Sequence, residues 1–289
     1  MISYDILAYR LFGKLARRFE NDLPKLDPSL KKAGLNFTSD EWLSMVFFNA
    51  IISSVVISIL AVLISLFIVS SIISSIPIAI GTGILIGLGV GVFTFYYPSQ
   101  LIGNRNKKID NSLHFATIYM ATLAGTGMPP YKIFAILSKF KEFTEISKTA
   151  EEINKYIEVF GLDFNEALEQ GANNTPNKDL HDLLWSLRST IQAGGNIRKF
   201  LDQRAVALTN QYRRRLENYV KTLSLFLEMY ITVVIVGSVF VLVLTTIMGI
   251  LGGNAEQIQL LQVILITIGL PAMSLVFIVI LKTINPTEV

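Results

Sequence analysis

Charged residues are missing from three long parts of this chain of 289 residues. Asp, Glu, Lys and Arg are absent from residues 42–104, 229–255 and 257–281, which are rich in apolar side chains. A helix of about 20 residues crosses a hydrocarbon core of about 30 Å, so the first part has room for two spans and each of the others for one. Four such helices would leave a soluble protein too little polar surface. We therefore expect an all-α, polytopic membrane protein with about four transmembrane helices.

The first pair of spans is predicted from its apolar runs and from two prolines. We place the first span at about residues 43–69 and the second at about residues 77–97. Proline is favoured in the first turn of a helix and disfavoured in its interior. Pro77 is therefore expected in the first turn of the second helix, and Pro98 is expected to end that helix.

Three glycines recur every four residues in the second span, at Gly83, Gly87 and Gly91. Residues four apart share one face of a helix, so this spacing predicts a groove in which another membrane helix approaches closely. A phosphate-binding loop is the alternative, but the spacing fits neither G-x-G-x-x-G nor a P-loop, and no lysine follows.

The second pair of spans is expected near residues 229–251 and 258–281, with a turn at residues 252–254. Pro271 cannot donate a hydrogen bond to the carbonyl of Thr267, so a kink is expected in the last span. Glu228 stands at the edge of the third span, where a carboxylate needs a partner or water. It either pairs with another group or reaches the interface and stays solvated.

The first 41 residues are predicted to begin with a basic amphipathic helix. One side of this helix is apolar and the other is basic; the apolar residues are Ile6, Leu7, Leu11, Leu15 and Phe19, and the basic residues are Arg10, Lys14, Arg17 and Arg18. Such a helix lies on a membrane surface or packs against a soluble domain.

The central region, residues 103–221, has helical periodicity and no alternating strand pattern. Clusters of Gly, Pro and Asn separate five or six helices of ordinary length, at residues 125–130, 161–163, 174–176 and 194–196. Glycine supplies the left-handed residue that closes a helix, while Asp163 and Asn196 are expected to cap the helices that follow. The glycines of these turns are Gly125, Gly127, Gly161, Gly194 and Gly195.

Basic residues predict the orientation of the chain. Seven Lys or Arg residues precede the first span, seventeen lie in residues 105–221, one follows the last span, and the two outer turns have none. By the positive-inside rule, both termini and the central region face the cytoplasm. We expect five parts: a cytoplasmic amphipathic segment (1–41), a transmembrane pair (42–98), a cytoplasmic helical bundle (99–227), a second transmembrane pair (228–282) and a cytoplasmic tail (283–289).

Three segments between predicted helices share a glycine-centred pattern. They are residues 123–128 (LAGTGM), residues 160–168 (FGLDFNEAL) and residues 191–197 (IQAGGNI) followed by Phe200-Leu201. In this order, and in a domain framed by spans, they resemble the type II secretion F-protein family, the membrane platform proteins of type IV pili, Tad pili, secretion pseudopili and archaella. Many members have two copies of the helical domain, so this chain resembles the shorter, single-domain members.

The resemblance implies a non-enzymatic, multi-pass scaffold in the cell membrane, beneath a growing filament. The partners it implies are a hexameric secretion-type ATPase, pilin-like filament subunits and the lipid bilayer. It also implies a second subunit, either another copy of this chain or a paralogous platform protein. Glu228 would then be a candidate contact with a filament subunit.

Basic clusters are the candidate contacts with such an ATPase. They comprise Arg213, Arg214, Arg215, Arg198 and Lys199 in the central region, and Arg10, Lys14, Arg17 and Arg18 in the first helix. An acidic protein surface and lipid phosphates attract such clusters by the same Coulomb interaction. A positive-inside anchor is therefore the alternative.

Catalytic, metal and cofactor chemistry is not indicated. The chain has no Cys, its histidines His114 and His181 lack a zinc-ligand spacing, and neither a Walker motif nor H-E-x-x-H occurs. Nucleic-acid binding is not expected, because residues 105–221 have thirteen acidic side chains against seventeen basic ones. A small-solute transporter or channel is the alternative function, but it would need discontinuous or polar spans around a midplane site. An intramembrane protease would need a catalytic pair, which the spans lack.

Overall fold

The computed structural model describes residues 4–20, 26–35, 37–68, 72–251, 260 and 262–284. Every regular element in this part of the chain is helical. The chain divides into two compact units, Met1–Arg204 and Ala205–Val289, which are described separately. The helices of the first unit are α1 (Tyr4–Glu20), α2 (Leu26–Ala33), α3 (Ser39–Ile68), α4 (Ile72–Gly125), α5 (Pro130–Leu137), the short 3₁₀ helix η1 (Lys141–Phe143), α6 (Thr144–Glu158), α7 (Phe164–Asn174), α8 (Lys178–Gln192) and the start of α9 (Ile197–Tyr230).

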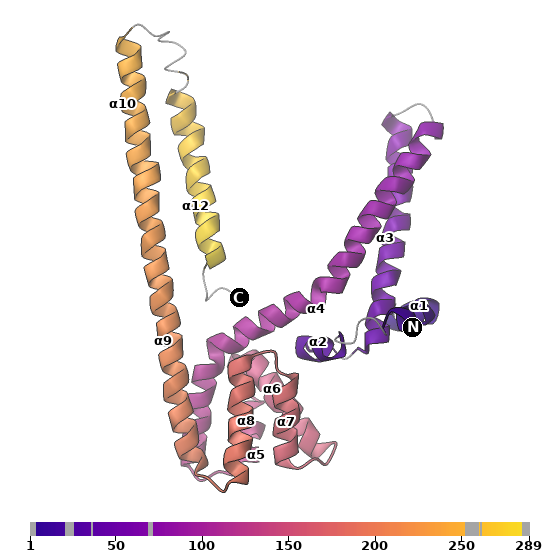
Figure 1. The fold of residues 1–289 in the computed structure, drawn as a ribbon, viewed down its shortest axis with the longest axis vertical. Helices are drawn as coiled ribbons and strands as arrows, with labels where there is room; N and C mark the ends of the chain where they lie inside the picture. Colours follow the sequence, from indigo (N-terminus) through magenta and orange to yellow (C-terminus); the bar gives the residue numbers. More distant parts are fainter. Residues whose placement is uncertain are drawn as a thin grey trace. The chain divides into compact units, whose positions relative to one another are not determined.

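Four helical stretches are long and apolar enough to cross a membrane. They are Ser39–Leu63, Ala79–Gly125, Ile197–Ile250 and Gln262–Lys282. The all-α, polytopic architecture expected from the sequence is thereby confirmed. The first two stretches belong to α3 and α4, which run side by side as the first membrane pair (Figure 1).

The second helix of this pair differs from the sequence prediction at both of its prolines. Helix α4 begins at Ile72 and continues to Gly125, so Pro77 lies beyond its first turn and Pro98 does not end it. A proline inside a helix removes one backbone hydrogen bond and bends the helix without necessarily ending it. Figure 1 accordingly shows α4 changing direction along its course. The helix therefore joins the first membrane pair directly to the bundle.

The bundle is formed by α5–α8 with η1, the last part of α4 and the start of α9. Its core is built of aliphatic side chains from each of the longer helices, among them Leu113 and Met120 of α4, Ile133 and Leu137 of α5, Ile146 and Ile153 of α6, Leu168 of α7, Leu183, Leu184 and Leu187 of α8, and Leu201 of α9. Removing such side chains from water stabilises the fold by about 1.5–3 kcal/mol each before conformational entropy is counted. The bundle therefore has a core of its own.

Capping residues fix where two helices of the bundle begin. Asp163 accepts a hydrogen bond from the backbone N–H of Asn165 and so starts α7, and Asn177 accepts one from Leu180 and so starts α8. The side-chain amide of Asn177 also donates to Asp110 of α4 at 2.6 Å. The start of α8 is thereby fixed to the long helix.

The N-terminal helices pack at the base of the first membrane pair. A buried cluster joins Ala8 of α1, Leu30 of α2 and Trp42, Met45 and Val46 of α3. Trp42 also stacks against Tyr97 of α4, with ring centroids 6.3 Å apart. This aromatic pair lies where both helices leave the apolar region, a depth at which Trp and Tyr are enriched in membrane proteins.

Helix α1 packs through its alanines, and its leucines are exposed. Ala8 and Ala16 are fully buried, whereas Leu7, Leu11 and Leu15 are 40%, 61% and 50% exposed. Small residues allow α1 to lie close against α3, and the leucines then face outward beside the basic residues. The side chains of Ile6 and Phe19 are not among those that the structure describes.

The second unit is a pair of long helices. The rest of α9, the π-helical segment η2 (Ile231–Val236) and α10 (Gly237–Ile250) follow one another without a break. They are paired with the π-helical segment η3 (Leu265–Gly269) and α12 (Leu270–Ile284) (Figure 1). The third span, expected as a separate helix near residue 229, is thus the end of a helix that begins in the bundle. The turn expected at residues 252–254 lies outside the described residues.

Candidate functional site

The basic residues of α1 lie on its exposed side, at the start of the first span. Arg10, Lys14, Arg17 and Arg18 are all exposed. Arg17 donates hydrogen bonds to the hydroxyl of Tyr9 at 2.6 Å and to the carboxylate of Asp40 at 3.3 Å. The remaining three cations project from the helix beside its exposed leucines, so this surface combines positive charge with apolar side chains.

A second pair of basic residues lies in the first turn of α9. Asn196 caps this helix by accepting a hydrogen bond from the N–H of Lys199 at 3.0 Å. Arg198 is exposed, forms a long ion pair with Asp202 at 3.9 Å, and lies next to Gly125 at the end of α4. Within the first unit, the start of α9 is at the end of the bundle and α1 is beside α3, so these two basic groups are well separated (Figure 1).

The three consecutive arginines lie further along α9, in the second unit. Arg213 and Arg214 are exposed, and the guanidinium of Arg215 lies 6.0 Å from the ring centroid of Tyr212. Successive residues of an α-helix point about 100° apart, so the three arginines form a band around the helix and not a single face. Glu228, in the last turn of α9, is exposed at its side chain, and its carbonyl accepts from Thr232.

The glycine-centred turns of the bundle close three helices in the left-handed conformation. Gly127, Gly161 and Gly194 have φ of +78°, +68° and +66°. Backbone hydrogen bonds from residues after the helix end then reach back to its last carbonyls, as from Leu162 to Tyr156 at 3.1 Å. Gly125 and Gly195 do not have positive φ. The turns thus have a structural role, because they set where the helices of the bundle end.

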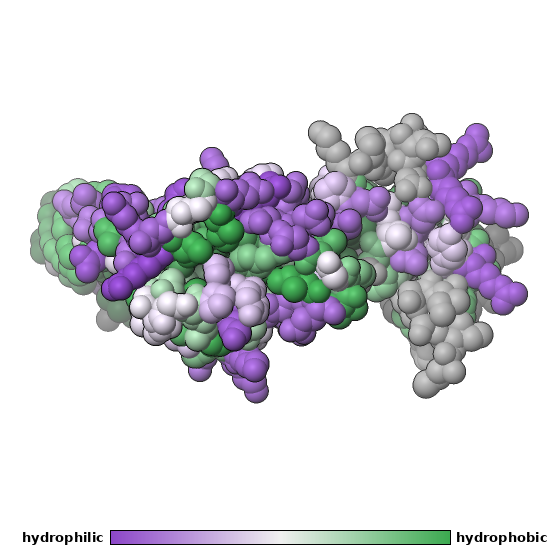
Figure 2. Space-filling model, turned by 90° about the horizontal axis from the view of Figure 1, so that it is seen from below, coloured by the Kyte–Doolittle hydropathy of each residue, from purple (hydrophilic) through white to green (hydrophobic). Residues whose placement is uncertain are grey.

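Hydrophilic side chains cover much of the bundle when it is seen from below, with apolar patches between them (Figure 2). In the part of the bundle between residues 126 and 196, the large apolar side chains that are exposed are Tyr131, Val159 and Phe160. Surfaces of this kind suit contacts with soluble partners more than with lipid tails.

The glycines of the second span line the contact between α3 and α4. A Cβ atom on Gly83 would lie 2.8 Å from the carbonyl oxygen of Ser54, and one on Gly87 would lie 2.7 Å from that of Ala50. A Cβ on Gly91 would approach the side chain of Ala50 to 3.1 Å. Backbone groups occupy the space that side chains would need, so the two helices are held at close range.

An ion-pair junction that the sequence reasoning did not identify joins α2, α4 and α6. The Nε of Arg105 donates to Glu145 at 2.8 Å, and its Nη1 donates to the carbonyl oxygen of Lys32 at 2.8 Å. The ammonium group of Lys148 donates to the other carboxylate oxygen of Glu145 at 2.8 Å. Only 12% of the Arg105 side chain and 7% of the Glu145 side chain are exposed. The guanidinium therefore ties the N-terminal segment and the bundle to one point on α4.

Gly34 completes this junction. It has φ of +76°, and a Cβ atom at this position would lie 2.7 Å from Nη1 of Arg105. Glycine is the residue that adopts such a conformation at no steric cost and leaves room for the guanidinium. One signal in the sequence could have indicated Arg105, since it is the first charged residue after the charge-free residues 42–104. Glu145 has no comparable signal.

The electrostatics of the junction favour the ionised carboxylate. Burial alone would raise the pKa of Glu145, but the hydrogen bonds from Lys148 and Arg105 outweigh it and hold the pKa below the ordinary value of 4.5. The nearby Glu152 differs: burial raises its pKa, and the charge of Arg105 opposes this only in part. The pKa of Glu145 is thus lowered and that of Glu152 is raised, although both residues lie on α6.

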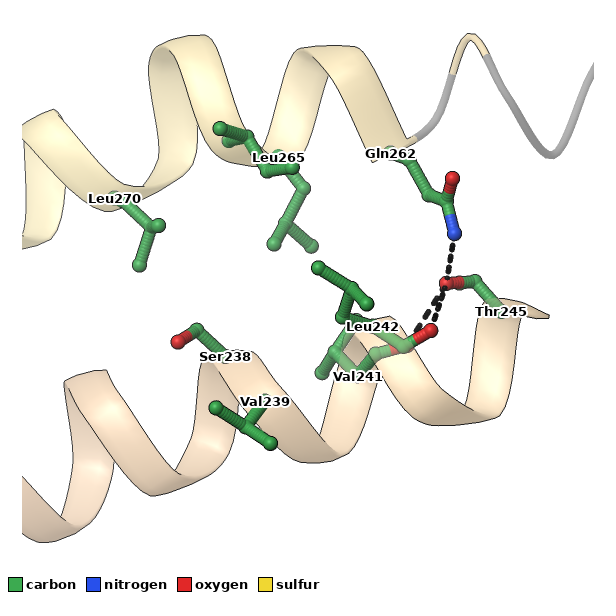
Figure 3. A pocket seen from close by; sticks show the side chains of 9 residues that line it. Ser238, Val239, Val241, Leu242, Thr245, Gln262, Leu265 and Leu270 are labelled. Atoms are coloured by element: carbon green, nitrogen blue, oxygen red, sulfur yellow. Dashed lines mark hydrogen bonds between the residues drawn. The ribbon is translucent and has the colours of Figure 1, made fainter. Parts of the chain in front are cut away.

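A cavity of about 260 Å³ lies inside the second membrane pair, between α10 and η3. Gln262 donates a hydrogen bond to the hydroxyl of Thr245 at 2.6 Å at one end of the cavity (Figure 3). The other lining side chains are apolar apart from Ser238. Since solute sites in transporters present several polar ligands and unwound backbone, this lining does not resemble one. Pro271 lies just after η3, whose wider turns accommodate the missing proline N–H.

Comparison with known proteins gives a family match and several relatives. The family model for the type II secretion system (T2SS), protein F, matches residues 116–245, which run from the bundle part of α4 into α10. An uncharacterized protein of Methanocaldococcus jannaschii is 34% identical over 223 residues, 77% of this chain and 36% of the relative. No solved structure matches this chain.

Two further relatives are named flagella accessory protein J. The one from Methanocaldococcus jannaschii is 23% identical over 150 residues, 52% of this chain and 27% of the relative. The one from Methanococcus voltae is 27% identical over 162 residues, 55% of this chain and 28% of the relative. This chain thus spans between about a quarter and a little over a third of the length of these three relatives.

Proposed function

Since this chain belongs to the type II secretion F-protein family, we propose that it is the membrane platform of a machine that assembles a type IV filament or a secretion pseudopilus. In this proposal it couples a cytoplasmic assembly ATPase to the insertion of pilin-like or archaellin-like subunits. The observation that supports it most is the family match over the bundle, set between two apolar helix pairs. The relatives named flagella accessory protein J favour an archaellum-like filament.

The decisive experiment is genetic and biochemical. Deleting the gene should abolish the surface filament or the secreted product while its subunits are still made, and the tagged full chain should co-purify with a secretion-type ATPase. Normal filaments and normal secretion in the deletion strain would overturn the proposal. The platform is also proposed to be non-enzymatic. ATP turnover by the purified chain, lost through a point substitution in it, would contradict that part.

The proposed orientation has both termini and the bundle in the cytoplasm, as the distribution of Lys and Arg favours. Single cysteines are convenient probes, because the chain has none of its own. A cysteine at Ser138 in the bundle should resist a membrane-impermeant maleimide in intact cells, and a cysteine at Asn254 should react. Labelling at Ser138 in intact cells would contradict this orientation.

The proposed contact with the ATPase is the exposed basic surface of α9 at Arg213 and Arg214. Reversing both to Glu should weaken ATPase binding strongly, because several like charges act together, and added salt should weaken the wild-type complex as well. Lys107→Glu with Lys108→Glu is the matched control, since it makes the same charge change at exposed positions of α4. If the Arg213 and Arg214 variant keeps its topology and pulls down as much ATPase as the wild type, this surface is not the contact. The basic residues of α1 would then be the next candidate.

A further inference from the structure

A polar cavity of about 280 Å³ lies beside the ion-pair junction, between the end of α2, the last turns of α6 and the end of α7. Neither the candidate contacts with the ATPase nor the membrane helix packing involves it. Its volume is just below the range of about 300–1,000 Å³ typical of small-molecule sites, so it suits a head group more than a large cofactor. It is lined by Lys31, Gly34, Glu152, Lys155, Tyr156, Phe160 and Asn174.

The walls of the cavity present two cations and a fixed polar pair. Lys31 of α2 and Lys155 of α6 are exposed and come from separate helices. The side-chain amide of Asn174 donates to the hydroxyl of Tyr156 at 2.9 Å, which fixes both groups. The hydroxyl hydrogen of Tyr156 then stays available to an acceptor in the cavity.

The charged side chains that line the cavity are two cations, Lys31 and Lys155, and one acid, Glu152. Arg105 and Lys148 are paired with Glu145, and Glu151 and Glu158 are exposed elsewhere on α6. Burial raises the pKa of Glu152, so its protonated form is more accessible than that of an ordinary glutamate. A protonated carboxyl donates a hydrogen bond and does not repel an anion.

The junction beside the cavity lies within about 12 Å of the end of the apolar region. Tyr97 stacks on Trp42 at the end of the apolar region, and eight residues of α4 separate it from Arg105. At 1.5 Å per residue this is about 12 Å at most, and less because α4 bends. A head-group layer extends roughly 5–8 Å beyond the hydrocarbon core on each side. Gly34, which contacts Arg105, is therefore close to that layer.

One side chain that lines the cavity is apolar and exposed. Phe160 is 62% exposed, although most large apolar side chains of the bundle are buried. The ring of Phe160 lies 5.9 Å from that of Tyr156, between their centroids. Two cations beside an exposed aromatic ring match a lipid, whose phosphate is joined to an apolar body, better than a free ion.

We propose that this cavity is a phosphate-binding site, whose ligand is the head group of an anionic lipid or a free phosphate group, held between Lys31 of α2 and Lys155 of α6. Tyr156 donates a hydrogen bond to the phosphate, and Glu152 is the one acidic side chain that lines the cavity. A phosphate shared by the two lysines joins the N-terminal segment to the bundle across the cavity. A lipid ligand would in addition hold the bundle at the membrane surface.

The test uses the purified full chain in detergent, with three probes: a short-chain phosphatidylglycerol, the matching phosphatidylcholine and inorganic phosphate. Native mass spectrometry counts retained lipid, and a titration that follows thermal unfolding gives the affinity for each probe. Phosphatidylglycerol should bind and phosphatidylcholine should not, because only the former has a net negative charge. Binding of inorganic phosphate with no advantage for phosphatidylglycerol would assign the site to a free phosphate group.

Three variants decide whether this cavity is the site. Lys31→Glu with Lys155→Glu should weaken binding by at least about tenfold, since hydrogen bonds to charged groups are lost at two positions. Glu152→Gln should bind as tightly as the wild type or more tightly, because it removes a negative charge without changing the shape. The control Lys107→Glu with Lys108→Glu makes the same charge change at exposed positions of α4 and should keep wild-type affinity.

Unchanged binding after the double reversal, or equal losses in the control, would overturn the proposal. If the reversed protein does not fold, Lys31→Gln with Lys155→Gln gives the same test with smaller perturbation. Neither readout involves the ATPase or a filament. These experiments therefore test the phosphate site independently of the proposed platform function, and either proposal can be contradicted while the other holds.

Discussion

The two membrane pairs hold their helices together in different ways. In α3 and α4, glycines bring the backbones so close that a Cβ on Gly87 would lie 2.7 Å from a backbone oxygen. In the second pair the contacts are aromatic and polar, such as Tyr230 with Ser274 at 3.2 Å. Cavities do not distinguish the pairs, because one of about 360 Å³ lies between α3 and α4 and one of about 260 Å³ lies in the second pair. Lipid tails are as apolar as the helices, so close packing and hydrogen bonds decide which pair is held firmly. The first pair is thus held by close approach of the two backbones, and the second by contacts between side chains.

The pairs also differ in their relation to the bundle. The first pair and the bundle belong to one compact unit, whereas the second pair forms a unit with most of α9. The junction of Arg105, Glu145 and the carbonyl of Lys32 supplies a tie within the first unit.

The largest loss of stability is expected when the ion-pair junction of Arg105 and Glu145 is broken. Arg105→Gln should lower the free energy of unfolding of the first unit by about 3 kcal/mol, the low end of the range for a broken buried pair, because Lys148 still contacts Glu145. The two tryptophans report separate regions, Trp42 the first pair and Trp185 the bundle. Single-tryptophan variants should show coincident unfolding for the wild type and separate transitions for Arg105→Gln.

The control for this experiment is Arg198→Gln. Arg198 is 66% exposed and lies 3.9 Å from Asp202, so its loss should change stability much less. Equal effects of the two substitutions would show that the junction does not tie the first pair to the bundle.

The next largest effect is expected from a substitution that disrupts the close packing of α3 against α4. Gly87→Leu should cost about 1–3 kcal/mol, because the side chain has to displace the backbone of α3. Gly89 lies on the same helix, and a Cβ atom added there would meet nothing within 4 Å, so Gly89→Leu changes helix propensity equally without a clash. Unfolding in mixed detergent, followed by Trp42 fluorescence, compares them. Similar stabilities for both variants would mean that close helix packing is not what holds this pair.

The apolar pattern was enough to predict the four spans and the all-α fold, because charge is excluded from lipid whatever the tertiary structure. It could not predict where helices begin and end, since Pro98 lies inside α4 and the helix that leads into the third span begins in the bundle. A proline's effect depends on whether neighbouring turns and bends offset one lost hydrogen bond, which is a property of the packed structure.

The polar contacts were harder to predict than the spans. The sequence did not indicate which side of α1 packs against α3, because Ala8 and Ala16, which permit close approach, have weaker hydrophobic signals than leucine. Arg105 and Glu145 are forty residues apart, and the partner of a buried charge is decided by the fold. The role of Gly34, which leaves room for the guanidinium of Arg105, likewise becomes visible only in the folded structure.

A smaller loss of stability is expected at acidic pH. The pKa of Glu145 is lower in the folded protein than its ordinary value of 4.5, so the ion pair stabilises the fold above that value. This contribution is lost as the pH falls below 4.5 and through the folded pKa. The effect is smaller than that of Arg105→Gln, because the buried guanidinium of Arg105 loses its carboxylate but keeps its hydrogen bond to the carbonyl oxygen of Lys32. Glu145→Gln should remove this part of the pH dependence, and an identical acid profile for that variant would exclude Glu145 as its source.

The smallest effect is expected in the second pair, where Gln262 donates to Thr245 inside the membrane. Hydrogen bonds between membrane helices contribute about 0.6 kcal/mol on average, because the unfolded chain in the membrane also finds partners. Gln262→Leu should therefore cost about that much, and the cavity beside it gives the new side chain room to repack. A double-mutant cycle with Thr245→Val, followed by circular dichroism during detergent unfolding, isolates the interaction from the loss of each side chain. A coupling energy larger than the cost of Gly87→Leu would reverse the comparison, since the second pair would then depend on one polar contact more than the first depends on its glycines.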